Sequence, residues 1–282
     1  MLYRALRGSG PGGLAGILPV TAEGLVRPLL GVSRAWVLEW NRAHGLEWRE
    51  DASNADPRFR RNALRRILPE LGRLVNPAAP EALARLAGIA LDEEADWRAR
   101  TEEAAARVWS PEEGDPLALA APVDALASHG PALTRRLLRH ALESVRGSLR
   151  SIDHAHVEQV LLLAGRRRGD GRIQLPGAWA ERSCGWLRIA AAPPAPVAEI
   201  TVRGPRAAAI LRGWRPGDQF DGRPFRDRLR RRNIPRWRRP RWPVLASGSD
   251  LLWAEGFGCS AAGVEAGWPA GISLSEIRSL SI

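Results

Sequence analysis

The stretch from Pro80 to Trp109 constrains this chain more than any other. It is rich in Ala, Leu, Glu and Arg and has no internal proline, so it predicts one long helix, or two shorter helices broken near Gly88. The turn residues of 111–122 predict a loop after it. Because the chain has 282 residues and a domain takes about 150, we expect roughly two domains with sizeable cores.

Residues 1–75 have the pattern of the tail of an α/β domain, in which glycine-rich turns precede two helices. Ser33 is placed to cap the first helix, and Gly45 stands where a left-handed residue would end it. Asp56 is placed to cap the second helix, with Pro57 at its first position.

Residues 76–192 are predicted to form a mainly helical domain. After the long helix, helical periodicity returns at 131–145 and 153–163. Two short apolar runs, 173–176 and 186–189, then predict a β-hairpin or a small sheet.

Three prolines within 191–196 predict a linker to a last domain, residues 197–282. That domain should be a compact α+β unit, because strand-like runs alternate there with glycine-rich turns and one short arginine-rich helix. The strand-like runs are 199–203, 242–245 and 251–254, and the helix is 225–232. The predicted fold class is thus multidomain, α/β plus α+β.

Arginine supplies every basic side chain, because the sequence contains no lysine, and the formal net charge is +11. A guanidinium stays charged near pH 7 and presents a planar fork to phosphate oxygens, so this excess predicts a polyanionic partner such as nucleic acid. Most of the excess lies between Arg215 and Arg241, where eleven Arg stand against three Asp. Indole rings among them suit base stacking. We predict RNA contact by Arg215, Arg226, Arg230, Arg231, Arg232, Arg236, Trp237, Arg238, Arg239 and Arg241.

Two plainer explanations stay open at this point. A genome-wide preference for arginine would explain the missing lysine, although it would not explain the net excess of charge. A solvated basic face, with Trp237 and Trp242 packed into the domain core, would explain the cluster without RNA.

Neither a metal site nor a disulfide framework is expected. Cys184 and Cys259 are far apart and lack partner spacing with histidine, and His154 and His156 would point to different faces of a helix. The longest apolar run, 160–164, is too short to cross a bilayer, and the first twenty residues lack a signal-peptide core. We therefore expect no membrane partner and a cytoplasmic location.

Two phrases near the beginning are the most specific motifs of the chain. They are Asp51-Ala52-Ser53-Asn54 and Arg61-Asn62-Ala63-Leu64-Arg65, which Leu68-Pro69 closes. Segments 1–10, 131–139, 175–177 and 212–220 add to them in order. Together these motifs resemble the tRNA(Ile)-lysidine synthases, which modify an anticodon, and the resemblance covers nearly the whole chain.

The resemblance implies a ligase that forms a carbon–nitrogen bond. It joins free lysine, at the expense of ATP with Mg²⁺, to the wobble cytidine in the CAU anticodon of tRNA(Ile). It also implies that residues 1–75 are the C-terminal part of the adenylating PP-loop domain, 76–192 a substrate-binding domain and 197–282 a tRNA-binding domain. Whether the chain forms a homodimer stays open.

The same resemblance implies the site residues. Asp51, in an Asx-type turn, would orient Arg61 and Arg65, whose remaining donors reach a nucleotide phosphate. From residue types alone, a structural salt bridge that locks the turn to its helix is the alternative. The expected catalytic residues are Asp51, Arg61 and Arg65, and the expected substrate-binding residues are Arg7, Gly8, Ser9, Gly10, Ser53, Asn54 and Asn62.

The family's Ser-Gly-Gly-x-Asp-Ser loop and His-x-x-Asp-Asp-x-x-Glu-Thr stretch do not occur in the sequence. The expectation is therefore a fragment without the ATP-binding loop that retains mainly tRNA recognition, the missing segment being lost, carried on another chain or cut off by a misplaced start. A non-catalytic RNA-binding protein derived from the family is the competing hypothesis. A decayed gene product with an unfolded N-terminus is a third.

Overall fold

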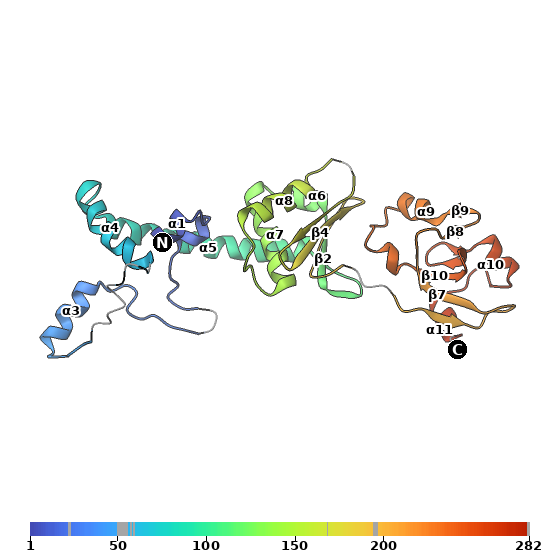
Figure 1. The fold of residues 1–282 in the computed structure, drawn as a ribbon, viewed down its shortest axis with the longest axis horizontal. Coiled ribbons are helices and arrows are strands. Elements are labelled where there is room, and N and C mark those ends of the chain that lie inside the picture. The colour runs from blue at the N-terminus through green and yellow to red at the C-terminus, as the bar shows by residue number, and fades with distance from the viewer. Residues whose placement is uncertain are drawn as a thin grey trace. The chain divides into compact units, whose positions relative to one another are not determined.

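The structure is a computed structural model that describes residues 1–21, 24–49, 56, 58, 60–167, 169–193 and 197–280, with the backbone alone at residue 61 (Figure 1). It consists of two compact units, Met1–Arg100 and Thr101–Ile282. Helices and two antiparallel or mixed sheets make this a mixed α/β protein. Among the described residues no helix is both long and apolar enough to span a membrane.

The first unit is helical in its described residues. Ser33 Oγ accepts a hydrogen bond from the backbone N of Trp36 at 3.1 Å and caps α3, as predicted, and Gly45 follows that helix with a φ of +63°. The helices are α1 (Leu2–Leu6), α2 (Pro11–Leu14), α3 (Arg34–Ala43), α4 (Arg60–Leu74) and α5 (Ala79–Val108).

The start of α4 differs from the prediction. Asp56 does not cap it: its carboxylate accepts from the backbone N of Arg58 at 2.9 Å and pairs with the Arg58 guanidinium at 2.8 Å. An N-cap residue directly precedes the first helical residue, and α4 begins at Arg60, so Asp56 lies in the turn before the helix and not at its cap. Pro57 lies outside the described residues. The helix then continues through Pro69.

The long helix α5 confirms the central prediction. It runs unbroken for 30 residues, and Gly88 lies inside it without a break. Its last turns belong to the second unit, where Ala104, Ala105 and Val108 join the core. Strong helix formers in nearly every position allow such a length with only part of one face buried.

Residues 111–122 were predicted as a loop, and that prediction is wrong. They form a hairpin whose second strand lies inside a five-stranded antiparallel sheet of order β1-β2-β5-β4-β3, in which Ala120 pairs with Arg188. Pro116 and Pro122 lie near the two ends of β2, where a missing backbone N–H does not prevent pairing. The alanines between them, Ala118 and Ala121, are buried. The strands are β1 (Ser110–Glu112), β2 (Asp115–Pro122), β3 (Gly171–Leu175), β4 (Ala178–Ser183) and β5 (Trp186–Ala190).

Three helices pack with this sheet and bury its core. Leu137, Leu138 and Leu142 of α7 are fully buried and cluster with Leu187 and Ile189 of β5. The helices are α6 (Val123–Ala127), α7 (Pro131–Arg146) and α8 (His154–Ala164). The last two confirm the predicted helices, whereas the predicted hairpin is part of a larger sheet, so this region is less helical than expected.

The C-terminal part builds a seven-stranded sheet of order β6-β7-β10-β11-β8-β9, with β12 beside β11. The predicted strands and the arginine-rich helix are all present, as β6, β10, β11 and α9. The strands are β6 (Ile200–Val202), β7 (Ala209–Gly213), β8 (Gln219–Phe220), β9 (Arg223–Pro224), β10 (Pro243–Ser247), β11 (Asp250–Ala254) and β12 (Gly258–Cys259). The helices are α9 (Phe225–Arg231), the short 3₁₀ helix Arg239–Arg241, α10 (Ala261–Glu265) and α11 (Leu274–Ser279).

A buried ion pair fixes the loop that leads to β8. The guanidinium of Arg212 binds both carboxylate oxygens of Asp218 at 2.8 Å, and the side chains are 5% and 4% exposed. Asp218 also accepts from the backbone N of Arg215 at 2.8 Å. Because both charges have left water, each depends on the other for stabilisation.

Replacing Asp218 by Asn should therefore lower the free energy of unfolding by about 3–5 kcal/mol, because the Arg212 charge stays buried without its partner. The matched control is Asp96→Asn, which removes the exposed pair with Arg100 and should cost less than about 1 kcal/mol. Urea unfolding of the two variants measures both changes. Equal losses would show that burial of the pair does not matter.

Candidate functional site

Two arginines from distant segments meet at one phenol in the first unit. Arg7 Nη1 lies 3.3 Å from the hydroxyl oxygen of Tyr3, and Arg60 Nη1 lies 3.4 Å from the same atom. The phenol therefore accepts from two cations that would otherwise repel each other. An anionic acceptor placed between the guanidinium groups would be favoured, because it would offset their mutual repulsion.

The pKa of Tyr3 reflects the two neighbouring guanidinium groups. The hydrogen bond from Arg60 lowers the pKa of Tyr3 below its usual value, and Arg7 adds to the effect, because positive charge stabilises the phenolate. Beside it, Gly8 has a φ of +74°, and an added Cβ at Gly8 or Gly10 would meet no atom within 4 Å. Backbone at these glycines is therefore open to a ligand.

The sequence identified the Arg7–Gly10 loop but missed Tyr3 and Arg60. Tyr3 is the single tyrosine of the chain, and Arg60 directly precedes the arginine-containing motif, which are the two signals that could have pointed to them. The fold joins them because α1 packs beside α4.

The other predicted site residues of this unit divide into three groups. Asn62 is buried, and its Nδ2 donates to the backbone O of Asp56 at 2.9 Å, which ties α4 to the preceding turn. Arg65 is exposed and lines a shallow groove with Leu68 and Pro69. The remaining predictions concern Asp51, Ser53 and Asn54, which lie outside the described residues, and Arg61, whose side chain lies outside them too.

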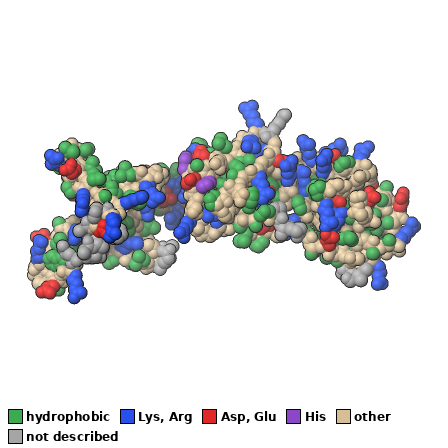
Figure 2. All heavy atoms as spheres, viewed as in Figure 1, with side chains coloured by type: hydrophobic (Ala, Val, Ile, Leu, Met, Phe, Trp, Pro, Cys, Tyr) green, Lys and Arg blue, Asp and Glu red, His purple; other side chains and the backbone are tan. Residues whose placement is uncertain are grey.

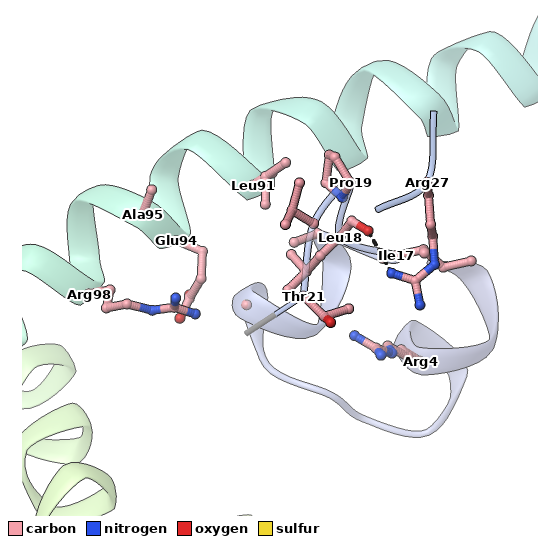
Figure 3. A pocket seen from close by; sticks show the side chains of 14 residues that line it. Arg4, Ile17, Leu18, Pro19, Thr21, Arg27, Leu91, Glu94, Ala95 and Arg98 are labelled. Carbon is pink, nitrogen blue, oxygen red and sulfur yellow. Dashed lines mark hydrogen bonds between the residues drawn. The ribbon is translucent and has the colours of Figure 1, made fainter. Parts of the chain in front are cut away.

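A cleft of about 650 Å³ lies between α5 and the loop after α2 (Figure 3). Glu94 and Arg98 lie on its α5 side, whereas Arg4 and Arg27 line the opposite side. The guanidinium of Arg27 donates to the backbone O of Leu18 at 2.9 Å and so keeps that loop in place. The lining thus combines apolar side chains with one carboxylate and several guanidinium groups, which suits a small zwitterion.

The C-terminal part presents a basic surface, and Figure 2 shows arginine side chains gathered over the edge that carries α9. Phe225 and Leu229 anchor this helix in the core, and Arg226 and Asp227 between them are exposed. Arg226 makes only a loose 3.6 Å contact with the neighbouring Asp227. The exposed arginines of this basic surface are Arg223, Arg226, Arg230, Arg231 and Arg232.

Other predicted RNA contacts have intramolecular partners. Arg215 pairs with Glu199, and Arg232 donates to the backbone O of Gly256 at 2.6 Å. Arg239 Nε donates to the backbone O of Ile234 at 3.0 Å. Arg236, Arg238 and Arg241 bind residues of the five-stranded sheet region, namely Asp170, Glu112 and the backbone O of Gly114.

Trp237 is 3% exposed, so its indole is not placed to stack on bases in this structure. Trp242 is half-buried, donates from Nε1 to the backbone O of Glu255 at 2.9 Å and packs on Phe257. The indoles therefore follow the plainer of the two explanations, packing, while the arginines around them remain partly exposed. Sequence spacing could not separate these cases, because both place tryptophan beside arginine.

Three family profiles match the chain in order. A PP-loop domain matches residues 1–71, the TilS substrate binding domain residues 122–188, and the TilS substrate C-terminal domain residues 211–275. The chain is also 35% identical to the tRNA(Ile)-lysidine synthase of Solibacter usitatus (strain Ellin6076), in an alignment that covers 97% of this chain and 72% of that protein. The chain belongs to the tRNA(Ile)-lysidine synthase family.

Two further lysidine synthases have similar identity. The chain is 32% identical to that of Geobacter sulfurreducens, over 91% of this chain and 64% of the relative, and 38% identical to that of Symbiobacterium thermophilum, over 76% and 45%. The chain thus spans roughly half to three quarters of the length of the lysidine synthases it resembles.

The expectation that this lysidine synthase family member is a fragment without the N-terminal PP-loop is wrong, because the PP-loop domain profile matches residues 1–71. That expectation rested on the absence of two short sequence motifs, the Ser-Gly-Gly-x-Asp-Ser loop and the His-x-x-Asp-Asp-x-x-Glu-Thr stretch. The match instead covers the glycine-rich loop and most of α4, the region where Tyr3, Arg7 and Arg60 meet. The comparisons also do not favour a non-catalytic RNA-binding protein.

The Tyr3 cluster can be tested by titration, because the tyrosinate absorbance reports this single tyrosine. Replacing Arg60 by Gln should raise the pKa of Tyr3 toward the ordinary tyrosine value of about 10, and Arg7→Gln should raise it less. The control Arg34→Gln changes an exposed arginine of α3 and should leave the titration unchanged. An unaltered pKa in Arg60→Gln would mean that the cluster does not form.

Proposed function

We propose that this chain is a tRNA(Ile)-lysidine synthase in activity and joins lysine to the wobble cytidine in the CAU anticodon of tRNA(Ile) with consumption of ATP. The observation that carries the proposal is the ordered match to the PP-loop, substrate binding and C-terminal domains within one chain. The reaction forms a carbon–nitrogen bond, and its tRNA substrate places it in the cytoplasm.

The proposed division of labour follows the predicted boundaries. Residues 1–75 belong to the ATP-binding domain, 76–192 bind substrate and 197–282 bind tRNA. The three profile matches fall inside these ranges, which supports the boundaries. Figure 1 also shows a separate helix-covered sheet and C-terminal sheet, each with its own buried core.

The residues of the first unit fit ATP. Two converging guanidinium groups and open glycine backbone form a cation-rich surface with space for phosphate oxygens. Arg7 and Arg60 would hold the phosphates, with Mg²⁺ as the accompanying cation. When bound, ATP supplies the adenylyl group that activates the cytidine ring for attack by the lysine amine.

The motif residues 51–65 keep the roles that the sequence predicts. Asp51 would receive the lysine amine and orient Arg61 and Arg65, while Ser53 and Asn54 would shape the predicted turn and Asn62 would hold the helix. Support for the role of Asn62 comes from its buried amide, which donates to the backbone O of Asp56 just before α4. The fixed helix start at Arg60 would then hold the following arginines in register.

Free lysine carries two ammonium groups and one carboxylate, and the cleft beside α5 offers both kinds of partner. Glu94 suits an ammonium, and Arg4 with Arg27 suits the carboxylate on the other side. We propose this cleft as the entry site for lysine.

The direct experiment is incorporation of labelled lysine into a transcript of tRNA(Ile) with the CAU anticodon. ATP-dependent incorporation is the expected result, and a CAU-to-GAU anticodon transcript should receive no label. Tight binding of the transcript without any incorporation would overturn the proposal and favour the non-catalytic alternative.

Replacing Glu94 by Gln should raise the KM for lysine about tenfold or more, because a hydrogen bond between charged groups contributes about 1.5–3 kcal/mol. The kcat should change little, since we assign Glu94 to the α-ammonium of lysine, whereas Asp51 would receive the reacting side-chain amine. Glu93→Gln is the matched control, because Glu93 is the adjacent exposed carboxylate of the same helix. If both variants gave the same KM as the unaltered chain, the cleft would not hold lysine.

Replacing Arg226 and Arg230 together by Gln should weaken tRNA binding and flatten its salt dependence. The slope of log K against log salt should change by about 1.4–1.8, since each phosphate contact contributes about 0.7–0.9. Arg278→Gln, on the exposed side of α11, is the control and should leave the slope unchanged. An unchanged slope in the double variant would show that the basic surface of α9 faces away from RNA.

A further inference from the structure

The arginines at 236, 238 and 241 do not form one open basic face. They lie in a segment, residues 234–241, that contacts the five-stranded sheet region within the second unit. We call this set of contacts the clasp. Its partners on the sheet side lie in β1, in the turn after β1, at the end of β4 and in the loop before β3.

The central contact of the clasp is a forked ion pair. Arg238 Nε donates to Glu112 Oε1 at 2.6 Å, and Arg238 Nη2 donates to Glu112 Oε2 at 3.1 Å. The Glu112 side chain is only 5% exposed, so its charge needs this guanidinium as compensation. The same guanidinium lies over the ring of Trp186, 5.4 Å from its centroid.

Backbone contacts surround this pair. Arg241 Nη2 donates to the backbone O of Gly114 at 2.5 Å, and the backbone N of Arg236 donates to Ser183 Oγ at 3.1 Å. A Cβ at Gly114 would lie 2.5 Å from Arg241 Nη2, and its φ of +70° also favours glycine. The hairpin turn is thus shaped to receive this arginine.

A second ion pair lies at the other end of the segment. Arg236 Nε lies 2.7 Å from Asp170 Oδ2, with side chains 69% and 25% exposed. Between the two pairs, Trp237 is buried, and Cys184 Sγ lies 3.5 Å from the backbone O of Ile234. Ion pairs, backbone hydrogen bonds and burial of an indole therefore all hold the eight residues 234–241 in place.

We propose that Glu112 and Asp170 hold residues 234–241 as an intramolecular clasp, so that Arg236, Arg238 and Arg241 position the C-terminal sheet instead of binding RNA phosphates. The concentrated positive charge is then offset by carboxylates of the same chain. Within residues 215–241, the basic surface on α9 then remains open to a polyanion. Glu112 and Arg238 are positioning residues, because they act through the placement of other groups.

Hydrogen exchange tests the clasp without RNA. Exchange of amides in residues 110–116 and 234–241 should accelerate about tenfold in Glu112→Gln and equally in Arg238→Gln. The charge-swapped chain, Glu112→Arg with Arg238→Glu, should recover most of the protection. Arg230→Gln is the control outside the clasp, and amides of α7 report that each variant remains folded.

The clasp would be overturned if exchange at 110–116 stayed unchanged in both Glu112→Gln and Arg238→Gln. It would also be overturned if the charge-swapped chain were no better protected than these single variants. If a single variant lost protection in α7 as well, the swapped chain would decide, since it restores opposite charges at the same positions.

Salt-dependent binding of a tRNA transcript gives a second test, which rests on the proposed function. Arg238→Gln should leave the slope of log K against log salt unchanged and should shift affinity in the same direction as Glu112→Gln. A slope reduced by about 0.7–0.9 in Arg238→Gln alone would show a direct phosphate contact and overturn the proposal. If the unaltered chain bound no tRNA, the proposed function would fail, while the exchange experiment would still test the clasp.

Discussion

Mutual repulsion among guanidinium groups is the constraint on which the C-terminal half of this lysidine synthase family member depends. Eleven arginines and three aspartates lie between residues 215 and 241, and concentrated like charge destabilises a compact state. The structure reduces this repulsion in two ways. Some of these arginines pair with carboxylates or backbone oxygens, such as Arg236 with Asp170 and Arg238 with Glu112, whereas exposed arginines of α9 remain in solvent. Within residues 215–241, the paired arginines therefore stabilise the fold, whereas the exposed arginines are available to a polyanion.

The sequence predicted the elements that local interactions determine. Ser33 caps α3, α7 and α8 lie where helical periodicity was found, and α5 runs the full length that its proline-free composition indicates. These features depend on residues a few positions apart, so a single sequence contains them. The family and the order of its domains were also predictable, because several motifs follow one another along the chain. Profile matches confirmed them.

What could not be predicted depends on contacts distant in sequence. The β1–β2 hairpin exists because β2 pairs with β5, about seventy residues later, and nothing local distinguishes it from a loop. Asp56 was predicted to cap a helix, but α4 begins only at Arg60, so Asp56 lies in the turn before it. In the candidate site, Tyr3 and Arg60 meet across two helices. Likewise, the sequence left open whether Trp237 stacks on bases or packs into the core, and the structure shows it buried.

The most direct measurement is a comparison of tRNA binding by two triple variants across a range of salt concentrations. One replaces Arg226, Arg230 and Arg231 of α9 by Gln, and the other replaces Arg236, Arg238 and Arg241. The account predicts that the first flattens the slope of log K against log salt by about 2–2.7 and that the second leaves it unchanged. Equal flattening by both variants would contradict the account, because the clasped arginines would then be contacting phosphates.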